Sequence, residues 1–185
     1  VEQWVAPMKC IRGWALTKLR RKKEGFEQIG QALAAFREIG VTNLLPLMSV
    51  MFAEAAIEIG ESDKALAAIE EALDASRRTG MLHSDSELLR LRGEILLRQK
   101  IGCELPERSE RLFAEAESCF RQAAAVARMQ GAKSLELRAA VSLAKLLRER
   151  GRPAEARECL APVFQWFTEG QATADLLEAR ALLEE

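Results

Sequence analysis

Residues 24–33 (EGFEQIGQAL) and residues 64–73 (KALAAIEEAL) contain the pattern that decides the fold. When the two stretches are aligned at an offset of 40 positions, an isoleucine, an alanine and a leucine coincide. Within each stretch the apolar residues recur at spacings of three and four, which is the period of an amphipathic α-helix. A helix that returns at a fixed offset predicts a protein built from helical repeats.

The same register continues through the rest of the chain. Gly13, Ala53 and Gly93 follow one another at intervals of 40 positions, and after an insertion within 101–111 the pattern resumes at Ala144. Each unit has room for two helices. We expect first helices at about 3–20, 44–60, 85–100 and 133–150, second helices at about 24–39, 62–79, 109–130 and 153–169, and a capping helix at 173–184. A small residue at these register positions should let the partner helix come close.

Composition supports an all-α protein. The 185 residues include 24 Glu but only 4 Asp, together with 30 Ala and 26 Leu. Glu, Ala and Leu favour helices over strands. The formal net charge of −1 argues against a dedicated nucleic-acid binder. The longest apolar stretch is too short to span a bilayer, and the four cysteines lack C-x-x-C spacing, so we expect free thiols in a cytoplasmic protein.

The sequence holds no motif for catalysis or for a cofactor. It lacks a phosphate-binding glycine loop and a G-x-S-x-G nucleophile motif, and its single histidine, His83, excludes every two-histidine metal site. Cys119 and Cys159 share a repeat position, but we interpret them as small buried hydrophobic residues rather than metal ligands. We therefore expect no catalytic, metal-binding or cofactor-binding residues.

The spacing of small residues resembles that of the tetratricopeptide repeat. The second unit matches that family's positions best, and its residues are Ala53, Ala56, Gly60, Ala65, Ile69 and Ala72. The first unit departs from the pattern at Arg20 and Gly25, and the 40-residue period is longer than the standard one. Residues 114–170, with IRGWAL (11–16) and ELLRLRGEILL (87–97), are similar to the C-terminal repeat region of large bacterial class III adenylate or guanylate cyclases and signalling-ATPase regulators.

This resemblance implies one domain over 1–185, a right-handed superhelix of four antiparallel helix pairs. Its units would be about 3–40, 44–80, 85–131 with the insertion 101–111, and 133–170, followed by the capping helix. It also implies a non-catalytic regulatory scaffold, the C-terminal part of a longer signalling protein, that binds a protein or peptide segment such as the parent's own ATPase or cyclase domain. The family's concave groove maps here onto Trp14, Glu54, Glu58, Arg90, Glu94, Arg98, Lys145 and Arg148.

Several alternatives stay open at this point. The groove could instead hold a small-molecule effector. The basic turn at 18–23 is either a solvated turn or a site for an acidic partner, and we interpret 101–111 as a surface loop. Three clustered aromatic residues, Phe164, Trp166 and Phe167, either fill the end of the core or mediate self-association.

Overall fold

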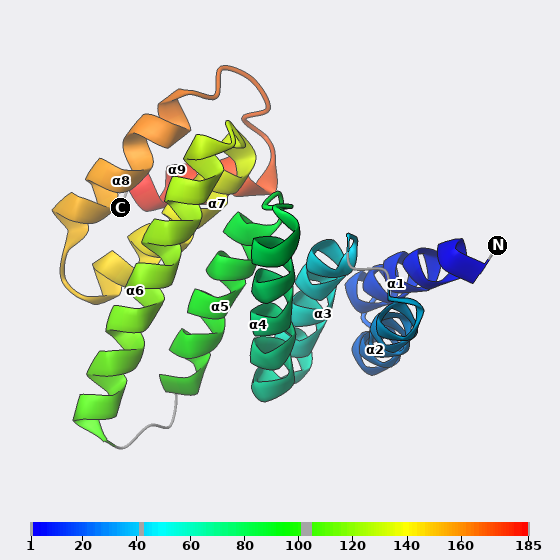
Figure 1. The fold of residues 1–185 in the computed structure, drawn as a ribbon. Helices are drawn as coiled ribbons and strands as arrows, with labels where there is room; N and C mark the ends of the chain where they lie inside the picture. Colours follow the sequence, from blue (N-terminus) through cyan, green and yellow to red (C-terminus); the bar gives the residue numbers. More distant parts are fainter. Residues whose placement is uncertain (1, 41–42, 101–104, 185) are drawn as a thin grey trace. The chain divides into compact units, whose positions relative to one another are not determined.

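The computed structural model describes residues 2–40, 43–100 and 105–184, and this part of the chain is all-α, with nine helices and no strand (Figure 1). The helices are α1 (Glu2–Lys18), α2 (Lys22–Ile39), α3 (Leu45–Ile59), α4 (Ser62–Thr79), α5 (Asp85–Lys100), α6 (Pro106–Met129), α7 (Lys133–Glu149), α8 (Pro153–Gln165) and α9 (Ala174–Glu184). The chain divides into two compact units, Val1–Leu91 and Arg92–Glu185.

In the first unit, successive helices pack against one another. Helix α1 contacts both α2 and α3, α2 contacts α3, and α3 contacts α4. The apolar faces of α1, α2 and α3 form a common core around fully buried side chains such as Ile29, Leu33 and Phe36. Phe26 and Phe52 stack at the edge of this core, with their ring centroids 4.8 Å apart.

Glycine brings α1 and α2 into direct backbone contact. A Cβ atom on Gly25 would lie only 2.4 Å from the carbonyl oxygen of Gly13, and one on Gly13 would lie 2.7 Å from Cγ1 of Ile29. Real Cβ atoms do not approach other atoms so closely. The expectation that a small residue at position 13 lets the partner helix approach is therefore confirmed, and Gly25 serves the same contact from the other side.

In the second unit, α7 packs against α6 and α8, and α9 covers parts of α7 and α8 (Figure 1). The core here includes the fully buried Phe120, Leu147 and Leu160. A Cβ atom on Gly93 would lie 2.5 Å from the ring of Phe120, so position 93 also requires a small residue.

The turn between α1 and α2 departs from the glycine pattern of the turns that follow α3 and α7. Arg20, between α1 and α2, has φ 65°, and no other non-glycine residue of the described ranges has a positive φ. Gly60 and Gly151 occupy the matching turns, 40 and 131 positions later, with φ 84° and 71°. The turn between α1 and α2 thus keeps the left-handed conformation even though it lacks the glycine that favours it.

Two sequence predictions need correction. Residues 106–111 are not loop, because Pro106 starts α6 and places its missing N–H in the first helical turn; residues 101–104 lie outside the described ranges. Helix α8 ends at Gln165 rather than near 169, so Trp166 and Phe167 follow the helix instead of belonging to it. The remaining helices begin and end within a few residues of the prediction.

None of the helices in the described ranges combines the length and the apolar character needed to cross a membrane.

Candidate functional site

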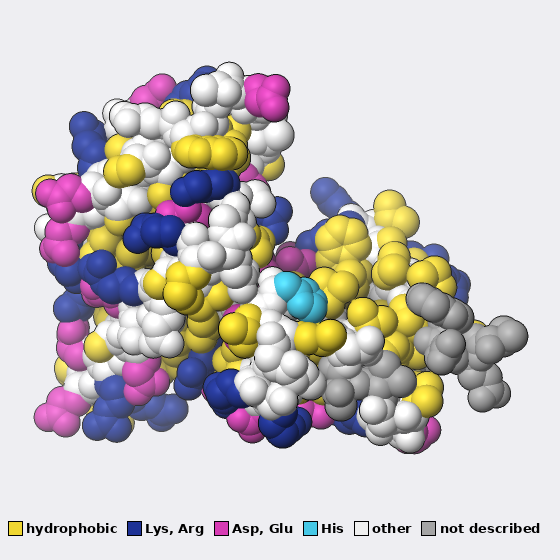
Figure 2. Space-filling model, turned by 45° about the horizontal axis from the view of Figure 1, so that its top comes forward, with side chains coloured by type: hydrophobic (Ala, Val, Ile, Leu, Met, Phe, Trp, Pro, Cys, Tyr) yellow, Lys and Arg dark blue, Asp and Glu magenta, His cyan; other side chains and the backbone are white. Residues whose placement is uncertain are grey.

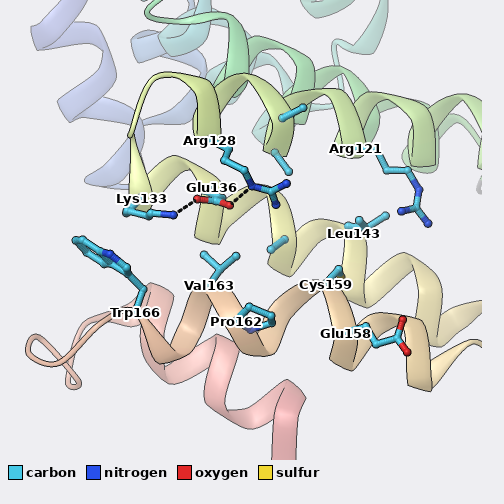
Figure 3. A pocket seen from close by; sticks show the side chains of 13 residues that line it. Arg121, Arg128, Lys133, Glu136, Leu143, Glu158, Cys159, Pro162, Val163 and Trp166 are labelled. Carbon is cyan, nitrogen blue, oxygen red and sulfur yellow. Dashed lines mark hydrogen bonds and ion pairs between the residues drawn. The ribbon is translucent and has the colours of Figure 1, made fainter.

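The second unit has an open groove between α6 and α8 whose floor is α7 (Figure 3). Its volume is about 450 Å³, within the range of about 300–1,000 Å³ found for ligand pockets. The lining residues are Arg121, Ala124, Ala125, Arg128, Lys133, Glu136, Ala140, Leu143, Glu158, Cys159, Pro162, Val163 and Trp166.

Small side chains explain why the groove exists. Ala124 and Ala125 line it from α6, and Ala140 lines it from α7. Because alanine carries only a methyl group, these positions leave space that longer side chains would fill. Leu143, Val163 and Pro162 complete an apolar surface, and Figure 3 shows Val163 and Pro162 on the side of α8 that faces α7.

A buried carboxylate organises the charged end of the groove. The side chain of Glu136 is only 3% exposed, yet it accepts a 2.8 Å hydrogen bond from Nε of Arg128 and a 2.7 Å bond from Nζ of Lys133 (Figure 3). Arg128 comes from α6 and Lys133 from the first turn of α7, so Glu136 holds two helices together. Arg128 is itself 67% exposed and can still donate hydrogen bonds toward the groove.

The electrostatics of Glu136 follow from these contacts. Burial by itself raises the pKa of the carboxyl group, but the hydrogen bonds from Lys133 and Arg128, with their positive charges, outweigh burial and lower the pKa. Glu136 is therefore ionised at neutral pH. It fixes the two cations in place at the rim of the apolar groove. Because one carboxylate pairs with two cations, this rim keeps a net positive charge.

An aromatic side chain closes this end of the groove. The indole of Trp166 is 58% exposed, and Nζ of Lys133 lies 5.9 Å from the centre of its ring (Figure 3). An aromatic ring next to cations offers stacking area to a ligand at a low cost in conformational entropy. The groove thus joins an apolar floor, an aromatic edge and a positive rim.

Cys159 also lines the groove, but its thiol is not activated. Burial raises its pKa to about 11, so the sulfur remains protonated at neutral pH. Activation of a nucleophile needs a lowered pKa or an adjacent base, and neither is found at Cys159. The Cys159 thiol therefore does not act as a nucleophile at neutral pH.

The residues predicted for the concave groove lie elsewhere, and none of them lines the α6–α8 groove. In the first unit, Nε1 of Trp14 donates a 2.7 Å hydrogen bond to Glu54, which also pairs with Lys18 at 3.3 Å. Glu58 pairs with Lys22 at 2.5 Å. These contacts join α1 and the start of α2 to α3.

The predicted residues of α7 face α9. Lys145 pairs with Glu178 at 2.5 Å, and Arg148 donates a 2.8 Å hydrogen bond to the carbonyl oxygen of Leu182. Arg138, further along α7, pairs with Asp175. Helix α9 is therefore bound to α7 by three basic side chains.

The three predicted residues of α5 have different environments. Arg90 donates hydrogen bonds of 2.6 and 3.0 Å to Glu87. Glu94 accepts a 3.1 Å hydrogen bond from the hydroxyl of Ser142 on α7. Arg98 is exposed. Internal pairing thus occupies most of the predicted residues, as Trp14 and Lys145 illustrate.

The clustered aromatic residues divide into two kinds. Phe164 and Phe167 pack against the core of the second unit, whereas Trp166 is exposed and contacts Phe167 edge-on at 5.1 Å between centroids. Of the three, Trp166 alone is available to a ligand or a second copy.

Within the described ranges, no three side chains among His, Cys, Asp and Glu come together as a metal site. Cys10 and Cys119 are buried and reduced, and burial raises the pKa of the Cys10 thiol to about 12.

Sequence reasoning missed the α6–α8 groove because it considered only the first helix of each predicted repeat. A signal was present in the run Ala123–Ala125 on the second helix of the third unit, followed by Arg128, Lys133 and Glu136. Neither a model of a known protein family nor a curated protein matches this chain.

Proposed function

We propose that the chain is a non-catalytic, tetratricopeptide-like scaffold that binds a protein segment in the α6–α8 groove. The segment would place small apolar side chains against the alanines that line the groove and a carboxylate against Arg128 and Lys133. The observation that carries this proposal is the buried Glu136, which holds both cations at the rim of an apolar groove. A charge held in place before binding costs little further ordering when the ligand arrives.

The helix contacts support the repeat part of the proposal. Helices α1 and α2, α3 and α4, and α7 and α8 pack against each other, and α1 also contacts α3, as expected when first helices of neighbouring repeats lie side by side. We propose that the units form a right-handed superhelix and that the chain belongs to a larger bacterial regulator with a cyclase or ATPase domain. In such a protein the parent's own domain is a natural source of the bound segment.

A fluorescence titration tests the proposed site. The probes are a labelled peptide of alternating alanine, leucine and glutamate and a matched peptide with lysine in place of glutamate. The acidic peptide should bind at least about tenfold more tightly, a difference of about 1.4 kcal/mol. Arg128→Glu should remove this preference, whereas Arg111→Glu should retain it, because Arg111 is exposed on the same helix outside the groove.

Blocking the groove gives a second readout. Ala125→Trp should fill the groove and abolish binding, while Ala114→Trp, at another exposed position of α6, should not. Equal binding of the two peptides, or full binding by Ala125→Trp, would contradict the proposal.

The second candidate function is sensing of a small-molecule effector. It is favoured by the groove volume of about 450 Å³, which suits a metabolite as well as a peptide side chain. A thermal-shift screen with anionic metabolites separates the two functions, because a bound ligand raises the melting temperature by mass action. A shift that Ala125→Trp removes, without binding of the acidic peptide, would favour the sensor.

A further inference from the structure

Helix α1, together with Leu19 directly after its end, carries a row of apolar side chains that point away from the core of its unit. Val5, Met8, Ile11 and Leu19 are 44%, 57%, 47% and 71% exposed. With the exposed Ala15 they follow the spacings of three and four that place residues on one helix face. Figure 2 shows hydrophobic side chains reaching the surface of this unit, at the right of the view. We call these five residues the α1 stripe.

Three of the five matching register positions are buried in α3, and the other two, Met51 and Ile59, are half-buried. Forty positions after Val5, Met8 and Ala15 stand Leu45, Met48 and Ala55, which are 5%, 3% and 1% exposed. These side chains belong to the core that α3 shares with α1 and α2. Helix α3 thus uses this face to pack against other helices.

Helix α7 repeats this arrangement. At an offset of 131 positions from Val5, Met8, Ile11 and Ala15 stand Glu136, Ala139, Ser142 and Leu146, each at most 8% exposed, whereas Arg150, the counterpart of Leu19, is exposed. Helix α6 covers part of this face, since Arg128 of α6 bonds to Glu136. In two helices of matching register, therefore, the face that α1 leaves open is covered by helical neighbours.

The charged side chains that the structure describes on α1 itself are all positive. Lys9 and Arg12 are exposed on α1, four residues after Val5 and Met8 on the same side of the helix, and Arg20 and Lys23 follow in the turn and at the start of α2. These four cations have no partner among the described residues, whereas Lys18, Arg21 and Lys22 pair with glutamates. The cations would repel a second α1 stripe in a symmetric dimer and attract a negatively charged partner.

We propose that the α1 stripe is the docking surface for an acidic amphipathic helix of a partner protein. The partner's apolar face would cover Val5, Met8 and Ile11 as helices cover the equivalent residues of α3, and its glutamates or aspartates would pair with Lys9 and Arg12. This surface is separate from the α6–α8 groove. A chain that binds one ligand at each surface could connect two proteins.

The test uses the whole chain and two labelled helical peptides of about 18 residues, or five turns. Both peptides carry leucines at spacings of three and four; one has glutamates along the flanks of that row, and the other has lysines. We expect the acidic peptide to bind at least about tenfold more tightly. Met8→Glu with Ile11→Glu should weaken its binding by at least about tenfold, and Lys9→Glu with Arg12→Glu should reverse the preference.

The controls address folding and location. Met129→Glu with Leu177→Glu replaces two exposed apolar side chains of the second unit and should leave binding unchanged. Circular dichroism should show the same helix content in every variant, because the substituted side chains are exposed.

Four outcomes would overturn the proposal: equal binding of the two peptides; no binding of either; full binding by the Met8→Glu, Ile11→Glu variant; or tighter binding to phosphatidylserine vesicles than to the acidic peptide, which would indicate a membrane surface. Self-association in sedimentation equilibrium that the same double variant abolishes would identify a second copy as the occupant and would also overturn it.

Discussion

The α1–α2 pair and the α7–α8 pair align at an offset of 131 positions, but different residues stand where their helices cross. Positions 13 and 25 are glycines whose backbones touch, whereas the matching positions 144 and 156 are alanines, both buried. In the turn between the helices, Arg20 stands where the later pair has Gly151. The first pair thus has its glycines at the helix crossing and the second has its glycine in the turn. The comparison teaches that the two turns keep the same left-handed backbone conformation, with φ 65° and 71°, although different residues occupy them.

The largest expected effect comes from adding a methyl group at the glycine crossing. Gly25→Ala places a Cβ atom 2.4 Å from the backbone oxygen of Gly13, which cannot move without shifting α1. We expect a loss of about 3 kcal/mol in the free energy of unfolding, measured by urea denaturation. Gly30→Ala on the same helix is the control, since its Cβ would lie an ordinary 3.5 Å from Phe52. Equal effects of the two substitutions would show that the crossing is not the cause.

The next largest effect concerns Glu136, which occupies in α7 the position that Val5 occupies in α1. Glu136→Gln removes the negative charge that both Arg128 and Lys133 contact, and we expect a loss of about 2 kcal/mol at pH 7. The exposed Glu158→Gln in the same groove should change stability much less.

The loss from Glu136→Gln should depend on pH. Because the pKa of Glu136 is lower in the folded protein than in the unfolded chain, its ionisation stabilises the fold fully above the unfolded pKa of about 4.3. That stabilisation disappears as the pH falls through the folded pKa. Urea denaturation at pH 7 and pH 3 should therefore show a smaller difference between wild type and variant at pH 3, and an unchanged difference would contradict the assigned role.

The turn residues allow a reciprocal exchange. Gly151→Ala forces a side chain into φ 71° and should cost about 1 to 2 kcal/mol. Arg20→Gly relieves the same strain at φ 65° and should stabilise the protein by about 1 kcal/mol. Thermal denaturation of both variants measures the exchange. A destabilised Arg20→Gly variant would mean that the arginine side chain contributes more than its backbone strain costs.

The smallest effect is expected where the later pair already tolerates a Cβ atom. Ala156→Gly should cost roughly 0.5 to 1 kcal/mol, from backbone entropy and the loss of one buried methyl group. If this cost approached that of Gly25→Ala, the two helix crossings would be equally sensitive and the comparison would fail. Urea denaturation under the same conditions provides the measurement.

Sequence reasoning predicted the helices well because their apolar period, glycines and prolines are local signals. The starts of α4 at Ser62, α5 at Asp85 and α8 at Pro153 agree with the prediction. It failed where the outcome depends on distant contacts. The end of α8 at Gln165 accompanies the packing of Phe167 against the core, and the α6–α8 groove depends on alanines from two helices.

The residues predicted for the concave groove also depend on distant contacts. Their positions on the helices follow from the register, but their partners do not. The sequence around Trp14 does not indicate that its indole donates a hydrogen bond to Glu54. The sequence around Lys145 likewise does not indicate its ion pair with Glu178 on α9. A face that is polar in sequence can be exposed to a ligand or bonded to the next helix, and only the fold distinguishes the two.

The contact between Gly93 and Phe120 has a consequence for how this protein can change over time. The ring of Phe120 occupies the space that a Cβ atom on residue 93 would need, while the equivalent positions 53 and 69 hold alanine and isoleucine. The residue at position 93 therefore limits the size of the residue that position 120 can hold. A related sequence that gains alanine at 93 should also exchange its phenylalanine at 120 for an aliphatic residue, so covariation between these two columns should be visible in any alignment of relatives.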